Sequence, residues 1–237
     1  MRFTCEKSML VTGLNITSRT VAQKSSLSAI EGILCQAQVG LNLTGFNMEI
    51  ATTYLIDAEV SDPGACILPA KLFGDIIRRL PEGPVTVVVD ENYKVSIRAG
   101  YASFTISAES AEDYPELPDV NTGRSIRIPQ TALKELISGT IFAVSENQAR
   151  PIHTGVKFEV EDTSISAIAV DGFRLARRTF HPEEPTGREL SFVVPAQGLK
   201  EVEKILQDTD SCCLYPWHQT HPVPDRTGHS GLPPVGG

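Results

Sequence analysis

The sequence predicts an α+β fold made of two similar copies in tandem, and three observations lead to this prediction. The segment LPAKLFGDIIRRL carries a Pro-Ala pair at Pro69, and VPAQGLKEVEKIL repeats the pair at Pro195, 126 positions later. Both segments place apolar residues at helical spacing directly after a short apolar run typical of a strand. Elsewhere, apolar and polar residues alternate as in half-buried strands. In a chain of 237 residues, this repeat favours two domains.

Each copy is expected to contain two helices. The helices after Pro69 and after Pro195 each present one apolar face. These faces consist of Leu72, Phe73, Ile76, Ile77 and Leu80 in the first copy, and of Leu199, Val202, Ile205 and Leu206 in the second. An earlier helix opens each copy, over 8–22 and over 131–145, again with apolar residues close to helical spacing.

Extended segments are expected in the same order in both copies. They are 1–6, 32–38, 41–46, 49–60 and 65–68 in the first copy, and 125–129, 155–161, 164–171, 173–180 and 190–194 in the second. The first copy continues with an antiparallel meander over 85–90, 94–100 and 101–108. The order strand, helix, three strands, strand, helix therefore occurs twice.

Composition places the domain boundaries. The segment 110–125 is acidic, contains proline and has no periodicity, so it is the expected connector between a first domain at 1–120 and a second, incomplete domain at 121–210. From Ser211 onward Pro, His, Cys and the single Trp replace the alternating pattern. We expect 211–237 to be a disordered tail that is foreign to the fold. A shifted reading frame, residues added after a truncation and a genuine extension are three alternatives for its origin.

Charge and cysteine usage narrow the class of protein. A formal charge of -8 disfavours a chain that is basic throughout, but it allows a nucleic-acid binder whose basic residues gather on one face. Five cysteines, an odd number without C-x-x-C spacing, argue against a disulfide framework. No apolar run approaches the roughly 20 residues of a membrane span. A reducing cytoplasm fits these features.

The motifs of common enzyme classes are missing from the sequence. It contains no G-x-x-x-x-G-K-[ST], no G-x-S-x-G and no H-E-x-x-H, so no catalytic residue and no cofactor are expected. A metal site in the tail is a weaker alternative, because adjacent cysteines do not easily take tetrahedral positions. Its ligands would be Cys212, Cys213, His218 and His221.

Several separated segments resemble one family. MRFTCEKSML, LNLTGFNMEIA, LPAKLFGDIIRRLPEG, ARPIHTGVKFE and AVDGFRLARR are similar to the beta subunit of bacterial DNA polymerase III, the sliding clamp, and the similarity extends over 1–209. The resemblance implies a DNA-clamp fold, in which tandem domains each pack two helices on antiparallel sheet. It also implies a non-catalytic processivity factor, which acts in DNA replication in the cytoplasm at the nucleoid.

The resemblance implies a ring and a set of partners. Two chains of three domains join head to tail, with helices lining the hole and strands outside. The partners are double-stranded DNA bound without sequence preference, the DNA polymerase III alpha subunit, the clamp loader and other clamp-binding proteins. On this resemblance we expect the chain to lack the third domain, so that a closed homodimeric ring is not expected from it alone. The main interpretation is a sliding clamp that encircles duplex DNA and tethers the replicative polymerase. The alternatives are a truncated clamp fragment that forms no ring and only binds client peptides, and a cytosolic enzyme of unknown reaction.

Basic residues on the helices are the candidates for contact with DNA. A ring that slides needs weak attraction to phosphates without base readout. The candidates are Lys24, Lys71, Arg78, Arg79, Lys134, Arg150, Lys200 and Lys204. An ordinary solvated helix charge is the alternative for each of them.

Two further sites come from the resemblance. It assigns a groove for the short apolar motif of clamp clients to His153, Val170, Gly172, Phe173, Arg174 and Leu175, and an edge strand at the subunit joint to Phe104, Ile106 and Ala108. Apolar walls would accept apolar anchors while the Arg fixes their orientation. His153 stands where an apolar residue is usual, and Phe173 where His or Tyr is common. Independently of the family, Asp171 and Gly172 predict a tight hairpin in which the glycine has a positive φ.

Overall fold

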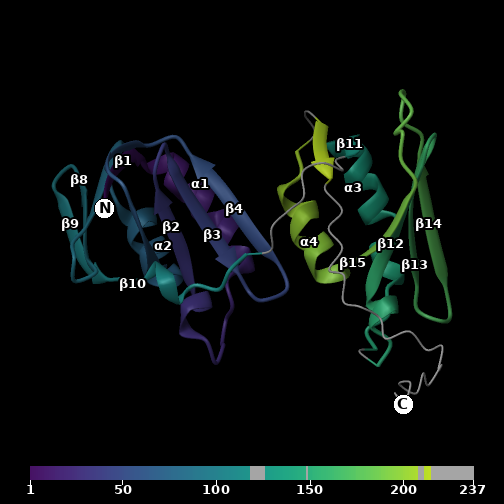
Figure 1. Cartoon of the computed structure of the whole chain (residues 1–237), viewed down its shortest axis with the longest axis horizontal. Helices are drawn as coiled ribbons and strands as arrows, with labels where there is room; N and C mark the ends of the chain where they lie inside the picture. Colours follow the sequence, from purple (N-terminus) through teal and green to yellow (C-terminus); the bar gives the residue numbers. More distant parts are fainter. Residues whose placement is uncertain (118–125, 148, 208–210, 215–237) are drawn as a thin grey trace, which may run out of the picture. The chain divides into compact units, whose positions relative to one another are not determined.

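Figure 1 shows the computed structural model of the chain, which describes residues 1–117, 126–147, 149–207 and 211–214. The chain divides into two compact units. The first unit takes Met1–Pro118 together with Pro195–Leu206, and the second takes the described residues of Asp119–Val194 and Gln207–Gly237. The helix after Pro195 is therefore grouped with the first unit, although its sequence belongs to the second copy.

The first unit has two antiparallel sheets and a helix layer. Its strands are β1 (Arg2–Glu6), β2 (Gly32–Ala37), β3 (Leu41–Phe46), β4 (Ala51–Ile56), β5 (Glu59–Asp62), β6 (Gly64–Pro69), β7 (Pro84–Val89), β8 (Lys94–Ala99), β9 (Ala102–Ser107) and β10 (Glu109–Ser110). They form two five-stranded sheets with the orders β5-β1-β7-β8-β9 and β10-β6-β2-β3-β4. The helices α1 (Lys7–Thr17) and α2 (Ala70–Arg79) lie side by side (Figure 1).

One continuous core joins the sheets and helices of the first unit. Phe3 of β1, Leu10 and Leu14 of α1, and Phe73 and Ile77 of α2 are at most 1% exposed. The strands alternate as expected, so that β8 buries every second residue beginning with Val95. Removing a side chain of this size from water contributes about 1.5–3 kcal/mol. The apolar residues that follow the helical and strand periods in the sequence therefore pack together in one core.

The second unit repeats part of this arrangement. Its elements are β11 (Ile126–Pro129), α3 (Gln130–Ser138), β12 (Gly155–Glu161), β13 (Ser164–Val170), β14 (Leu175–Phe180), β15 (Leu190–Pro195) and β16 (Ser211–Leu214), and α4 (Ala196–Ile205) follows β15. The sheets have the orders β14-β13-β12-β15 and β11-β16. Phe158 of β12 stacks on Phe192 of β15 with ring centroids 5.6 Å apart. The expected helices and most of the expected strands are confirmed.

Two glycines at equivalent positions explain part of the repeat. Gly32 begins β2 and Gly155 begins β12. A Cβ at Gly32 would lie 3.0 Å from the carbonyl oxygen of Leu68, and one at Gly155 would lie 2.6 Å from that of Val194. Both oxygens belong to the residue before the repeated proline, at the end of the neighbouring strand. At Gly32 the nearest atom to such a Cβ is Ile67 Cγ2, at 2.3 Å. A side chain is therefore excluded by the neighbouring backbone at Gly155, and mainly by the side chain of Ile67 at Gly32.

The single strand expected over 49–60 is wrong. The structure divides this segment into β4 and β5, which join different sheets. Asp57 and Ala58 separate the two strands, and the chain passes there from the edge of one sheet to the edge of the other. The alternating pattern continues across the corner because every second residue from Thr52 to Val60 is at least half-buried, so the apolar period does not mark the corner.

The first helix of each copy is shorter than expected. α1 ends at Thr17 and α3 ends at Ser138, and a short 3-10 turn follows each of them, Ser18–Thr20 and Ile141–Ala143. A buried threonine hydroxyl stands near each end. Thr20 Oγ1 donates to Thr17 O or to Gly45 O, each 3.1 Å away, and Thr140 Oγ1 donates to Leu136 O at 2.7 Å. These hydroxyls satisfy carbonyls that a longer helix would have paired.

The connector and the tail also differ from expectation. Tyr114 lies inside the expected connector, yet it is only 8% exposed, and its hydroxyl donates to Thr44 O at 3.3 Å. The start of 110–125 therefore packs on the first unit, whereas 118–125 lie outside the described residues. The tail expected from Ser211 begins instead with β16, which pairs antiparallel with β11. Residues 215–237, with His218 and His221, lie outside the described part of the chain.

None of the helices in the described residues is long and apolar enough to cross a membrane. The same residues contain no group of three or more His, Cys, Asp or Glu side chains placed to hold a metal ion.

Candidate functional site

A tight hairpin joins β13 and β14 and carries most of the expected peptide groove. Gly172 has φ of +98°, which confirms the positive φ predicted from the sequence. The carboxylate of Asp171 closes the turn, because its Oδ1 accepts from the backbone N–H groups of Phe173 at 2.9 Å and Arg174 at 3.1 Å. These donors, with Phe173 first, lower the pKa of Asp171 below its ordinary value. One ionised side chain therefore fixes the backbone of the hairpin.

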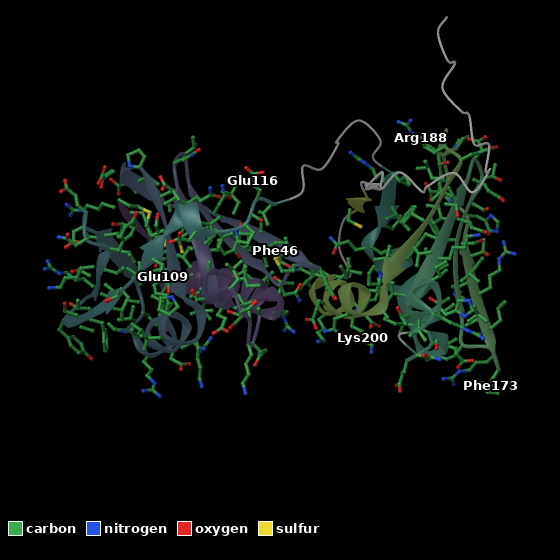
Figure 2. All side chains as sticks on the ribbon, turned by 60° about the horizontal axis from the view of Figure 1, so that its bottom comes forward. Phe46, Glu109, Glu116, Phe173, Arg188 and Lys200 are labelled. Carbon is green, nitrogen blue, oxygen red and sulfur yellow. The ribbon has the colours of Figure 1, made fainter. Side chains whose placement is uncertain are left out.

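The hairpin presents apolar side chains to solvent. Phe173 is fully exposed and Leu175 is 67% exposed, while Val170 is half-buried and lies opposite Leu175 in the strand register. Figure 2 shows Phe173 at one end of the second unit and Arg188 at the other. Contiguous exposed apolar surface on a protein often marks a site that a partner covers.

The structure brings five of the six expected groove residues together on this hairpin. The sixth, His153, is half-buried on the separate 3-10 turn Pro151–Thr154, and its backbone carbonyl accepts from Ser145 N at 2.8 Å. The assignment of all six to a peptide groove stays a prediction.

The sequence reading missed Phe142. Its ring lies 5.9 Å from Arg174 Cζ, within the range of a cation–π contact, and Phe142 is 57% exposed. A signal was available, because Phe142 falls off the apolar face that Leu133, Leu136 and Ile137 form in the expected helix.

The basic residues of the first unit gather on its helices and on one loop. Lys71, Arg78 and Arg79 are exposed on α2, and Lys24 is exposed in the loop after the 3-10 turn Ser18–Thr20. Arg78 is partly neutralised, since its Nη2 lies 2.9 Å from Asp75 Oδ1 and its Nη1 donates to Asn15 Oδ1 at 3.3 Å. The bond to Asn15 crosses from α2 to α1, so the helix layer holds this guanidinium in place.

The remaining basic residues lie on α3, on α4 and in one loop. Lys134 is half-buried on α3, and Arg150 is exposed just before the turn at Pro151–Thr154. Lys200 and Lys204 are exposed on α4, and Lys204 pairs with Glu201 at 2.7 Å. Figure 2 shows Lys200 on this helix. Contact of any of these residues with DNA stays a prediction.

The edge strand expected at a subunit joint is β9. It pairs only with β8 among the described strands and therefore lies at the edge of its sheet. Phe104 is 39% exposed, whereas Ile106 is 9% exposed and belongs to the core. A groove of about 540 Å³ runs between this edge and α2, lined in part by Leu72, Asp75 and Ala108. Leu72 is 49% exposed, so apolar surface continues from the strand to the helix.

The fold and these surfaces define a class: a duplicated α+β protein with basic helices, an exposed apolar hairpin and an open sheet edge. A family model described as the N-terminal domain of the DNA polymerase III beta subunit matches residues 1–118, and one for the central domain matches residues 127–215. The chain belongs to the DNA polymerase III beta subunit family. The second match includes β16, which supports the correction to the expected tail.

Individual relatives agree. The beta sliding clamp of Bacillus subtilis (strain 168) is 34% identical over 217 residues, which are 88% of this chain and 57% of the relative. The beta sliding clamp of Halalkalibacterium halodurans is 33% identical over 222 residues, 89% of this chain and 58% of the relative. A crystal structure of the DNA polymerase sliding clamp from Bacillus subtilis has a TM-score of 0.88 at 31% identity, covering 92% of this chain and 60% of that chain. The chain thus has the DNA-clamp fold and spans less than two thirds of the length of these relatives.

Proposed function

We propose that this chain acts as a DNA sliding clamp, a non-catalytic protein that encircles duplex DNA in the bacterial cytoplasm and tethers the replicative polymerase. The observation that carries the proposal is the duplicated clamp domain, in which a helix layer with exposed basic side chains is backed by antiparallel sheet. A ring built from copies of such a unit encloses DNA without reading its sequence. The basic helix faces then supply weak attraction to the phosphates.

The partners follow from the same proposal. Duplex DNA is bound without sequence preference, and the polymerase alpha subunit, the clamp loader and other clients bind the exposed hairpin. The open edge at β9 and the groove beside α2 form the joint with a second chain. A surface of this kind fits head-to-tail assembly, because an unpaired edge strand and exposed apolar side chains are stabilised when a partner covers them.

A test of the DNA surface replaces one helix charge. Arg79→Ala on α2 is expected to weaken binding to a duplex of random sequence by about two- to five-fold at low salt, because a partly screened phosphate contact is lost. The slope of log affinity against log salt should fall by about one. Fluorescence anisotropy measures both quantities.

A matched control variant is Arg98→Ala, which removes an exposed arginine of β8 rather than of a helix. It should leave the affinity for DNA unchanged. Equal losses for the two variants would mean that attraction to DNA is spread over the surface and would remove the helix layer from the proposal.

A second candidate function is peptide binding without a ring. One observation favours it: the hairpin exposes Phe173, Arg174 and Leu175. In this case the chain binds the apolar motif of clamp clients and does not stay on DNA. Retention on circular DNA distinguishes the two functions.

A further inference from the structure

The side chain of Arg174 is held from two directions. Its Nε donates to Asp171 Oδ2 at 2.8 Å, and the ring of Phe142 lies 5.9 Å from its Cζ. Asp171 belongs to the same hairpin, whereas Phe142 comes from the 3-10 turn Ile141–Ala143, which packs on β13. Two separate parts of the second unit therefore converge on one guanidinium.

The two contacts occupy different parts of the guanidinium. Asp171 takes the Nε edge, and Cζ lies over the ring of Phe142, 5.9 Å from the ring centroid. The bonds among the described residues include no acceptor for Nη1 or Nη2 of Arg174, and the side chain is 58% exposed. The Nη edge is thus left to an oxygen that approaches in the plane of the group, as a peptide carboxylate or carbonyl does.

We propose that Phe142 is a positioning residue that, together with Asp171, orients Arg174 for binding an acceptor oxygen of a client peptide. This inference rests on the proposed peptide-binding role of the hairpin and extends it to a residue outside the hairpin. An exposed arginine normally samples many rotamers, and ordering it on binding lowers affinity. A guanidinium already held by a carboxylate and a ring loses less freedom, so the peptide binds more tightly.

Two substitutions of Phe142 distinguish the effect of its aromatic ring on peptide binding from the effect of its apolar bulk. Phe142→Leu keeps an apolar side chain but removes the ring, and it should weaken peptide binding by about two- to five-fold, the effect of an exposed cation–π contact. Phe142→Trp keeps a π face, the most favourable one for a cation, and should bind at least as tightly as the original chain. The probe is a fluorescein-labelled peptide with the C-terminal residues of a bacterial DNA polymerase III alpha subunit, followed by anisotropy.

A double-mutant cycle tests whether Phe142 acts through Arg174. Arg174→Ala should weaken binding by itself, and Phe142→Leu should then cause no further loss in the Arg174→Ala background. Tyr101→Leu is the matched control, because it removes an aromatic ring that is 95% exposed on the first unit. Its affinity for the peptide should equal that of the unaltered chain.

A measurement without peptide tests the positioning directly. The Arg174 Nε–Hε proton should show an NMR shift displaced by the ring current of Phe142 and slow exchange with water, and Phe142→Leu should abolish the displacement and speed the exchange. An unchanged shift and exchange rate would overturn the inference, whatever the peptide does. An equal loss of affinity in both Arg174 backgrounds would also overturn it.

A different set of results would show that the proposed peptide-binding role of the hairpin is wrong. In that case the unaltered chain does not bind the peptide at all, while the NMR signature of Arg174 still depends on Phe142. If the unaltered chain binds, Arg174→Ala weakens binding and Phe142→Leu does not, only the role of Phe142 is refuted.

Discussion

At the scale of single residues, three thiols lie in the core of the first unit. Cys5, Cys35 and Cys66 are buried in one cluster, and Cys35 lies directly opposite Cys66 in the pairing of β2 with β6. Burial raises the pKa of Cys5 and of Cys66 to about 12, and it raises the pKa of Cys35 well above its ordinary value. The thiolate is the reactive form, so these cysteines are inert in the folded protein.

The first prediction concerns their reactivity and the stability of the fold at high pH. The folded pKa values lie above the ordinary value of 9.0, so stabilisation by the protonated thiols is complete below pH 9 and is lost as pH rises toward 12. The urea concentration at which the first unit is half unfolded should therefore be lower at pH 10.5 than at pH 8.

The reactivity of the thiols is tested separately. In a Cys212→Ser, Cys213→Ser background, Ellman's reagent should find no reactive thiol at pH 8 until urea unfolds the protein. Rapid reaction in the absence of urea would contradict the buried cluster.

The residues that the sequence predicted well are those whose role depends on local backbone geometry. Gly172 was predicted to have a positive φ because a tight hairpin requires it, and its φ of +98° confirms this. Phe142 was missed because its partner Arg174 lies 32 positions away in the sequence. Ile106 alternates with polar neighbours in the sequence. Only the structure shows that its side chain is buried in the core of the first unit rather than exposed at the edge of the sheet.

At the scale of elements, the start of β12 is a sharp test of the repeat. A Cβ at Gly155 would lie 2.6 Å from Val194 O and 2.7 Å from Val193 Cγ1, and a backbone oxygen cannot move aside as a side chain can. Gly155→Ala should therefore lower the free energy of unfolding by about 1–3 kcal/mol, as overpacking does elsewhere. Urea unfolding followed by circular dichroism measures the change.

The control for this prediction is Ser191→Ala, an exposed position in the neighbouring β15. It should change stability by less than about 0.5 kcal/mol. If Gly155→Ala were as stable as this control, the close approach of β12 and β15 would not be a constraint, and the explanation of the two repeated glycines would be wrong.

The sequence predicted most elements because their periods are strong and their ends carry proline or glycine. α2 and α4 begin directly after Pro69 and Pro195, at the expected positions. The predictions were wrong at the ends of helices and at a corner between strands, where the structure depends on tertiary contacts. Buried hydroxyls of Thr20 and Thr140 stand where the first helices stop, and the chain changes sheets between β4 and β5. Neither event changes the local pattern of apolar residues.

At the scale of the whole molecule, the duplication was visible in the sequence because both copies keep the same backbone constraints. The described part of the first unit builds two five-stranded sheets, whereas that of the second builds sheets of four and two strands. The two-stranded sheet contains β16, whose Cys-rich sequence has no alternating pattern and was assigned to a tail. Pairing with β11, 84 positions earlier at Ile128 and Cys212, is a long-range contact that composition cannot predict.

The most direct test of the proposed function asks whether the chain is held on DNA topologically. The purified protein is incubated with nicked circular plasmid, a bacterial clamp loader and ATP, and bound protein is separated by gel filtration before and after the plasmid is cut once. A sliding clamp stays with the circle at moderate salt and is lost when the DNA becomes linear, because it runs off the ends. Equal retention on both forms, or retention on neither, would contradict encirclement and leave peptide binding as the function of this chain.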